Sequence, residues 1–146
     1  MKSFLVSCFL AVMLTYCAYG HMDPEKYGEI FGDIANRSHH FCKAITEVPQ
    51  ELIDGVREGQ FPDVNSLKCY TTCLWVFAGS MNLDCTMNEK VLEKYMSGMN
   101  RNEDIEIMLE CRKEACESDA KSFCEQGYEL EKCIYEKVPN DSFIFY

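Results

Sequence analysis

The chain has 146 residues, of which 47% are hydrophobic and 26% charged, and its formal net charge is −10. Because so acidic a surface repels phosphates, we expect neither nucleic acid nor an anionic membrane as a partner. The length suits one compact domain with a modest core, since two domains would be cramped.

The N-terminus has the pattern of a secretory signal peptide over residues 1–20. Lys2 precedes an apolar run from Phe4 to about Thr15, and the small residues Ala18 and Gly20 follow. The run is shorter than the ~20 apolar residues that span a bilayer, so we expect no stable membrane insertion. The mature protein would be a secreted, extracellular domain over residues 21–146. It would carry 13 basic and 24 acidic side chains, a formal net charge of −11.

The first half of the mature chain shows helical spacing of its apolar residues. No segment shows the sustained alternation of apolar and polar residues that is typical of a half-buried strand. We therefore expect an all-α fold. The first helix is predicted over residues 24–41, and the second from Pro49 to just before Gly59. The third is predicted over residues 66–78. It is apolar nearly all round, which is typical of a central helix covered by the others.

Three further helices are predicted in the second half. Thr86 and Glu89 have the spacing of a capping box before a fourth helix that Gly98 ends. Asn102 can cap a fifth helix, and Asp119 can start a sixth that reaches about Lys137. Residues 138–146 then form a short tail that ends in apolar and aromatic side chains.

Cys8 and Cys17 leave with the signal peptide, so the mature chain keeps eight cysteines, which in a secreted protein predicts four disulfides. Cys69 and Cys73 should not bond each other. Residues four apart on a helix have Cβ atoms ~5–6 Å apart, whereas a disulfide needs ~3.5–4.5 Å. A zinc site is disfavoured because the next close pair, at residues 111 and 116, would diverge by roughly 140° on a helix. No CxxC redox motif is present. We expect no metal and no cofactor.

The spacing of six cysteines resembles the signature of insect odorant-binding proteins of the pheromone and general odorant-binding type. The pattern is Cys42-x26-Cys69-x3-Cys73-x37-Cys111-x12-Cys124-x8-Cys133, and its x3 and x8 gaps are the most rigid features of that family. The stretches VPQELIDGVREGQFPD, KCYTTC and GYELEKCIYE agree with it. The resemblance covers essentially the whole mature chain.

The resemblance implies a compact bundle of about six helices around a hydrophobic cavity. It also implies the pairs Cys42–Cys73, Cys69–Cys124 and Cys111–Cys133. Cys85 and Cys116 are extra to the pattern and are expected to bond each other. Taking Cys116 as the fourth family cysteine would leave seven residues before Cys124, which is short for the pattern, so Cys111 is preferred.

The function implied is that of a carrier in olfaction, which transports small hydrophobic ligands such as odorants or semiochemicals. A chemosensory receptor is a protein partner that this role allows, and the chain would be a monomer or a weak homodimer. Alternatives are a salivary or haemolymph scavenger of lipids or host mediators on the same fold, and a small secreted hydrolase. We expect no enzyme, because the thiols are paired and no nucleophile stands beside a base.

Candidate ligand contacts are large, soft side chains of the predicted helices, together with the tail, which in relatives folds over the cavity. Tyr95 and Tyr128 could orient a ligand through their hydroxyl groups. The expected ligand-binding residues are Ile34, Leu74, Phe77, Met81, Leu92, Tyr95, Met96, Met108, Tyr128, Phe143, Phe145 and Tyr146.

Overall fold

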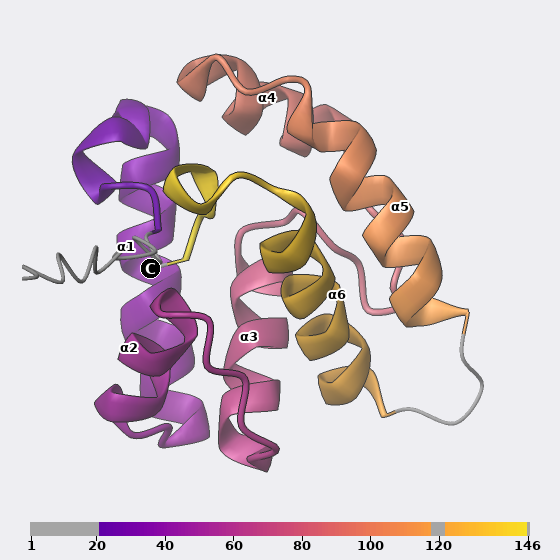
Figure 1. Cartoon of the computed structure of the whole chain (residues 1–146). Coiled ribbons are helices and arrows are strands. Elements are labelled where there is room, and N and C mark those ends of the chain that lie inside the picture. Colours follow the sequence, from indigo (N-terminus) through magenta and orange to yellow (C-terminus); the bar gives the residue numbers. More distant parts are fainter. Residues whose placement is uncertain (1–20, 118–121, 146) are drawn as a thin grey trace, which may run out of the picture.

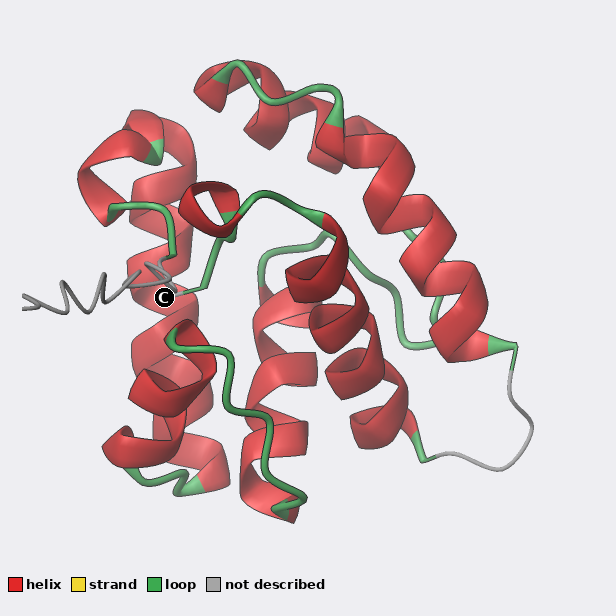
Figure 2. Cartoon of the chain, viewed as in Figure 1, coloured by secondary structure: helices red, strands yellow, loops and turns green. Residues whose placement is uncertain are grey.

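The computed structural model describes residues 21–117 and 122–145. The predicted signal peptide, Asp119 and Tyr146 lie outside these ranges. Within them the chain forms six α-helices and two short 3-10 turns and has no strand (Figure 2). The one departure from helix and loop is an isolated antiparallel bridge between Met81 and Met87. The predicted all-α fold is confirmed.

Six helices follow one another with short connections. The 3-10 turn η1 (Pro24–Lys26) leads into α1, and η2 (Asn140–Ser142) lies in the tail. The helices are α1 (Gly28–Thr46), α2 (Gln50–Arg57), α3 (Asn65–Phe77), α4 (Glu89–Met99), α5 (Asp104–Cys116) and α6 (Phe123–Lys137). Figure 1 shows α3 beside α6 at the centre, with α1 and α2 on one side and α4 and α5 on the other.

The central position of α3 agrees with its nearly all-round apolar sequence. Two disulfides leave it for different neighbours, Cys42–Cys73 to α1 and Cys69–Cys124 to α6. The approach of α6 is close because Gly127 has no side chain: a Cβ there would lie 2.8 Å from the Cα of Thr72. The Thr72 hydroxyl also donates a hydrogen bond to the Cys124 carbonyl oxygen at 2.9 Å. This part of the bundle is therefore tightly packed.

Two more disulfides hold α5. Cys111–Cys133 joins α5 to α6, and Cys85–Cys116 ties the loop between α3 and α4 to the last residue of α5. The four bonds are the same pairs that the family resemblance and the extra cysteines implied. Lys137 adds contacts from α6 to Glu110 at 3.3 Å and Glu114 at 2.7 Å.

Several predicted helix ends are wrong. Asn88, not Thr86, caps α4, since its side chain accepts from the Val91 N–H at 3.4 Å. Thr86 instead bonds to Asp84 in the preceding loop. The helix runs past Gly98 to Met99, and the following residue, Asn100, has a left-handed φ of 57°. Several short polar residues that could cap a helix lie near each end of α4. The spacing of residues in the sequence therefore did not identify which of them forms the cap.

The last two helices also start later than predicted. The side chain of Asn102 accepts from Ser97 at 2.9 Å and does not cap α5, which begins at Asp104. For α6, Ser122 and Glu125 form a capping box before the helix begins at Phe123. Among the described residues we find no helix with the length and apolar character that a membrane span requires.

The extra disulfide, Cys85–Cys116, should stabilise the fold but contribute little to ligand binding. Replacing Cys85 and Cys116 together by Ser should lower the free energy of unfolding by about 2–4 kcal/mol, because the unfolded chain gains freedom. Urea denaturation followed by circular dichroism measures the loss. Peptide mapping of the unreduced wild-type protein provides the control. A fragment linking Cys85 to Cys111, or an alkylated Cys85, would contradict the pairing.

Candidate functional site

A cavity lies between α1, α3, α4, α5, α6 and the tail, with a volume of about 80 Å³. A buried water needs about 10–15 Å³ of such space, so roughly five to eight waters, or a ligand of similar size, would fill it. Most wall residues are apolar. The lining residues are Tyr27, Phe31, Ala35, Ser38, Leu74, Trp75, Ala78, Ser80, Leu92, Tyr95, Met96, Asp104, Met108, Glu131, Ile134, Val138, Ser142, Ile144 and Phe145.

The tail forms one wall of this cavity. The Met22 N–H donates to the Phe143 carbonyl oxygen at 2.6 Å, and the Tyr27 hydroxyl donates to the Phe145 carbonyl oxygen at 3.3 Å. Arg101 donates to the Ser142 carbonyl oxygen at 3.4 Å. Backbone groups of the tail are thus held from both the N-terminal segment and the loop before α5. In Figure 1 the tail passes across the bundle towards α1.

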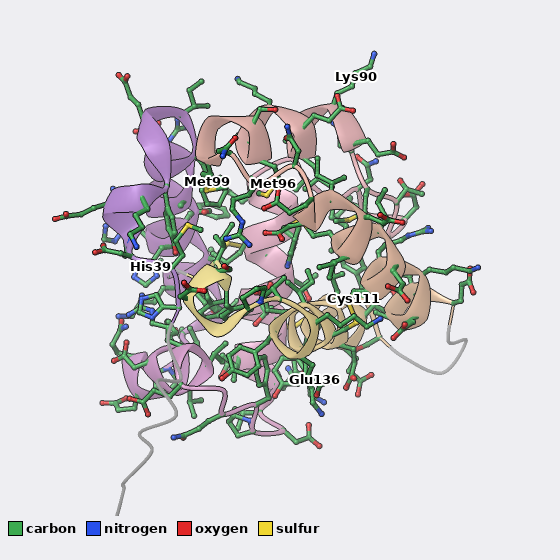
Figure 3. All side chains as sticks on the ribbon, turned by 45° about the horizontal axis from the view of Figure 1, so that its top comes forward. His39, Lys90, Met96, Met99, Cys111 and Glu136 are labelled. Carbon is green, nitrogen blue, oxygen red and sulfur yellow. A yellow bond between two sulfur atoms is a disulfide. The ribbon has the colours of Figure 1, made fainter. Side chains whose placement is uncertain are left out.

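The structure brings six of the predicted ligand contacts together on the cavity wall. They come from α3, α4, α5 and the tail, and they are Leu74, Leu92, Tyr95, Met96, Met108 and Phe145. In Figure 3 Met96 points towards the interior, whereas Lys90 at the start of the same helix points to solvent. The helical stripe that the sequence suggested for α4 is therefore the face that meets the cavity.

Five other predicted contacts do not line this cavity. Phe77 packs against Phe41, with ring centroids 4.9 Å apart, and Tyr128 donates to the Pro62 carbonyl oxygen at 2.8 Å. The ring of Phe143 packs against Tyr135, with ring centroids 4.8 Å apart. Met81 is buried in the core and Ile34 is half-buried on α1. Sequence identified these positions as apolar, but it did not show that the rings of Phe77 and Phe143 pack against Phe41 and Tyr135. Tyr146 lies outside the described residues.

The cavity contains a carboxyl group that the sequence interpretation missed. Glu131 of α6 is 4% exposed, and its Oε2 accepts a hydrogen bond from the Trp75 Nε1–H at 2.6 Å. Burial disfavours the charged carboxylate and raises the pKa of Glu131 to about 8, although the Trp75 hydrogen bond acts in the opposite direction. At neutral pH this side chain is therefore mostly a neutral acid.

A second acid, Asp104 at the start of α5, is buried beside the cavity and forms an ion pair with Arg101. Burial raises the pKa of Asp104, and the Arg101 guanidinium partly opposes that rise. Burial also raises the pKa of Tyr95, whose hydroxyl donates to the Ala78 carbonyl oxygen at 2.8 Å. The Tyr95 hydroxyl proton is thus already used within the protein.

A signal for Glu131 was present in the sequence. In GYELEKCIYE, Gly127, Glu131 and Ile134 recur at helical spacing, which places an acid on the buried stripe of α6. The wall positions Tyr27 and Phe31 had a similar signal, since they lie on one stripe of the first predicted helix. For Trp75 and Val138 no pattern distinguished the cavity wall from ordinary core.

The described residues offer no arrangement typical of catalysis. All eight of their cysteines are in disulfides. His39 is buried, with Nδ1 2.8 Å from the Tyr70 hydroxyl oxygen, whereas His40 is exposed. In the same part of the chain, no group of three or more His, Cys, Asp or Glu side chains could hold a metal ion. The arrangement can enclose an apolar molecule and present a carboxyl group to it.

Comparison with known proteins agrees with this geometry. The family model described as the PBP/GOBP family matches residues 27–137. The chain belongs to the PBP/GOBP family. Odorant binding protein 5 of the honeybee Apis mellifera has a similar fold, with a TM-score of 0.60, 23% sequence identity, and a match that covers 78% of this chain and 93% of that one. No curated protein matches this chain. This PBP/GOBP chain carries four disulfides, one more pair than the six-cysteine signature supplies.

Arg101 should be essential for stability, because it pairs with the buried Asp104 and also binds the tail. Replacing it with Met leaves a buried acid unpaired and should lower the free energy of unfolding at pH 7 by about 3–5 kcal/mol. Urea denaturation measures the effect. Combining Arg101→Met with Asp104→Leu removes both charges and should restore most of the loss. An equal loss in the single and double variants would contradict this coupling.

Proposed function

We propose that this protein is a secreted carrier that binds a small hydrophobic molecule, such as an odorant or semiochemical, in the cavity behind its tail. Residues 1–20 serve as the signal peptide, and residues 21–146 form the carrier domain. The domain acts as a monomer or weak homodimer and hands its ligand to a chemosensory receptor. The observation that carries this proposal is an apolar cavity in a member of the PBP/GOBP family.

The mechanism is equilibrium burial. Apolar ligand surface leaves water with a gain of ~25 cal/mol per Å², and a preformed wall reduces the cost of ordering. The space of about 80 Å³ suits compact ligands. Longer ligands require wall side chains to move. Met96 and Met108 can do so readily, because an unbranched thioether has several accessible conformations.

Trp75 provides a direct test, since it is the sole tryptophan of the chain and lies on the cavity wall. Titration with 1-bromohexane should quench its fluorescence, because bromine quenches an excited indole on contact. We expect a saturable curve with a Kd between about 1 and 100 µM, which corresponds to about −8.2 to −5.5 kcal/mol. Linear, non-saturating quenching would contradict binding in the cavity.

A matched pair of alanine substitutions on α1 locates the site. Ala35 is buried on the cavity wall, whereas Ala44 is exposed near the other end of the same helix. Ala35→Leu fills the cavity and should weaken 1-bromohexane binding by at least about tenfold. Ala44→Leu adds the same atoms elsewhere and should leave the Kd unchanged. Equal Kd values for the two variants would sink the assignment of this cavity as the binding site.

The tail contributes a second matched pair. Phe143 and Phe145 are both almost fully buried, but only Phe145 lines the cavity. Replacing either by Leu should lower stability by a similar amount, on the order of 1 kcal/mol, because each loses aromatic contacts. Phe145→Leu should change the Kd for 1-bromohexane several-fold, while Phe143→Leu should not. A larger effect of Phe143→Leu would mean that the bound ligand reaches beyond this cavity.

A further inference from the structure

We propose that Glu131 is the specificity-determining residue of the cavity, and that it donates a hydrogen bond to an oxygen acceptor, such as a ketone, aldehyde or ester carbonyl, on the ligand. This inference rests on the proposed carrier function and names the ligand class that the cavity selects. Tyr95 and Tyr128, the hydroxyl groups that the sequence suggested for this role, donate to the carbonyl oxygens of Ala78 and Pro62.

The hydrogen-bond geometry fixes which oxygen of Glu131 is available. The indole N–H of Trp75 can only donate, and it donates to Oε2 at 2.6 Å. In a neutral carboxylic acid Oε2 is then the acceptor, so the proton resides on Oε1. Within the described residues Glu131 has no other hydrogen bond and no cationic partner. The side chain lines the cavity, and a ligand carbonyl oxygen there can accept a hydrogen bond from the Oε1–H group.

The surroundings keep this acid neutral. Charged groups near α6 are engaged with other partners or exposed to solvent. Lys68 pairs with Asp63 and Glu125, Asp104 with Arg101, Lys137 with Glu110 and Glu114, and Arg112 with the Cys85 carbonyl oxygen. Glu106 and Lys113 of α5 are exposed. Burial raises the pKa of Glu131 to about 8, well above the usual value near 4.3. The donor is therefore present below about pH 8 and is lost as the pH rises through that value.

Isothermal titration calorimetry with heptane, 2-heptanone and hexylamine separates the possible roles of the carboxyl group. The ratio of the heptane Kd to the 2-heptanone Kd measures the preference for an oxygen acceptor. Glu131→Gln keeps a donor in the form of the amide NH₂, and its carbonyl oxygen can still accept from Trp75. Glu131→Met is apolar and of similar length. Glu136→Gln is the control, because Glu136 is exposed on the same helix and points away from the cavity (Figure 3).

At pH 6 the preference for 2-heptanone should be similar in the wild type, Glu131→Gln and Glu136→Gln, and about 3–10-fold smaller in Glu131→Met. Between pH 6 and pH 9 the preference should fall in the wild type and in Glu136→Gln, and stay constant in Glu131→Gln. Urea denaturation gives a readout without ligand. The stability of the wild type relative to Glu131→Gln should fall between about pH 4 and pH 8, because the unfolded state ionises first.

Two results would overturn the inference. The first is an unchanged preference for 2-heptanone in Glu131→Met. The second is tight hexylamine binding in the wild type that Glu131→Gln abolishes, which would show a carboxylate that recognises a cation. Failure of heptane and 1-bromohexane to bind the wild type would instead overturn the carrier function itself, and the inference with it.

Discussion

The constraint on which the structure depends is the double anchoring of α3. Cys69 and Cys73 lie four residues apart on one helix, and each is bonded to a different neighbour, so α1 and α6 are both fixed to the same turn of α3. Close packing between Thr72 and Gly127 occurs at that level. The cavity residues of α3 begin only beyond it, at Leu74 and Trp75. The two disulfides of α3 thus hold one end of that helix tightly, and the hollow end of the bundle lies beyond them.

The bonds to α3 also lie away from the cavity residues of the neighbouring helices. On α6 Cys124, which is bonded to α3, is near the start. The cavity residues Glu131 and Ile134 are in the second half, on either side of Cys133, which is bonded to α5. On α1 the order is reversed, with cavity residues before the cross-linked Cys42. A void removes dispersion contacts and buried apolar area, and this loss of stability matters in a chain of this size because its core is small. Cross-links that destabilise the unfolded state, by typically ~2–4 kcal/mol each, make such a void tolerable.

Polar groups at the hollow end are few and have distinct roles. Arg101 forms an ion pair with the buried Asp104 and also donates a hydrogen bond to the tail backbone. The same guanidinium therefore neutralises a buried acid and holds the tail in place as a cavity wall. Among the described residues Glu131 accepts a hydrogen bond from the neutral indole of Trp75 and has no cationic partner, so burial favours its protonated form. A buried acid without a cation departs from the rules that stabilise a core. Such departures are expected where a protein binds something.

The sequence by itself determined the helical class, the approximate helix centres and, through cysteine spacing, the family, because these depend on local periodicity and chain separation. It also placed Leu92, Tyr95 and Met96 on one inward stripe of α4. Only the tertiary structure decided which apolar positions meet the cavity and which meet a neighbour. Phe143 and Phe145 are alike in sequence, yet just one lines the void, because the direction of each ring depends on how the tail is held from Met22 and Tyr27. The protonated form of Glu131 is likewise a tertiary property, since it follows from burial between packed helices and not from any local pattern.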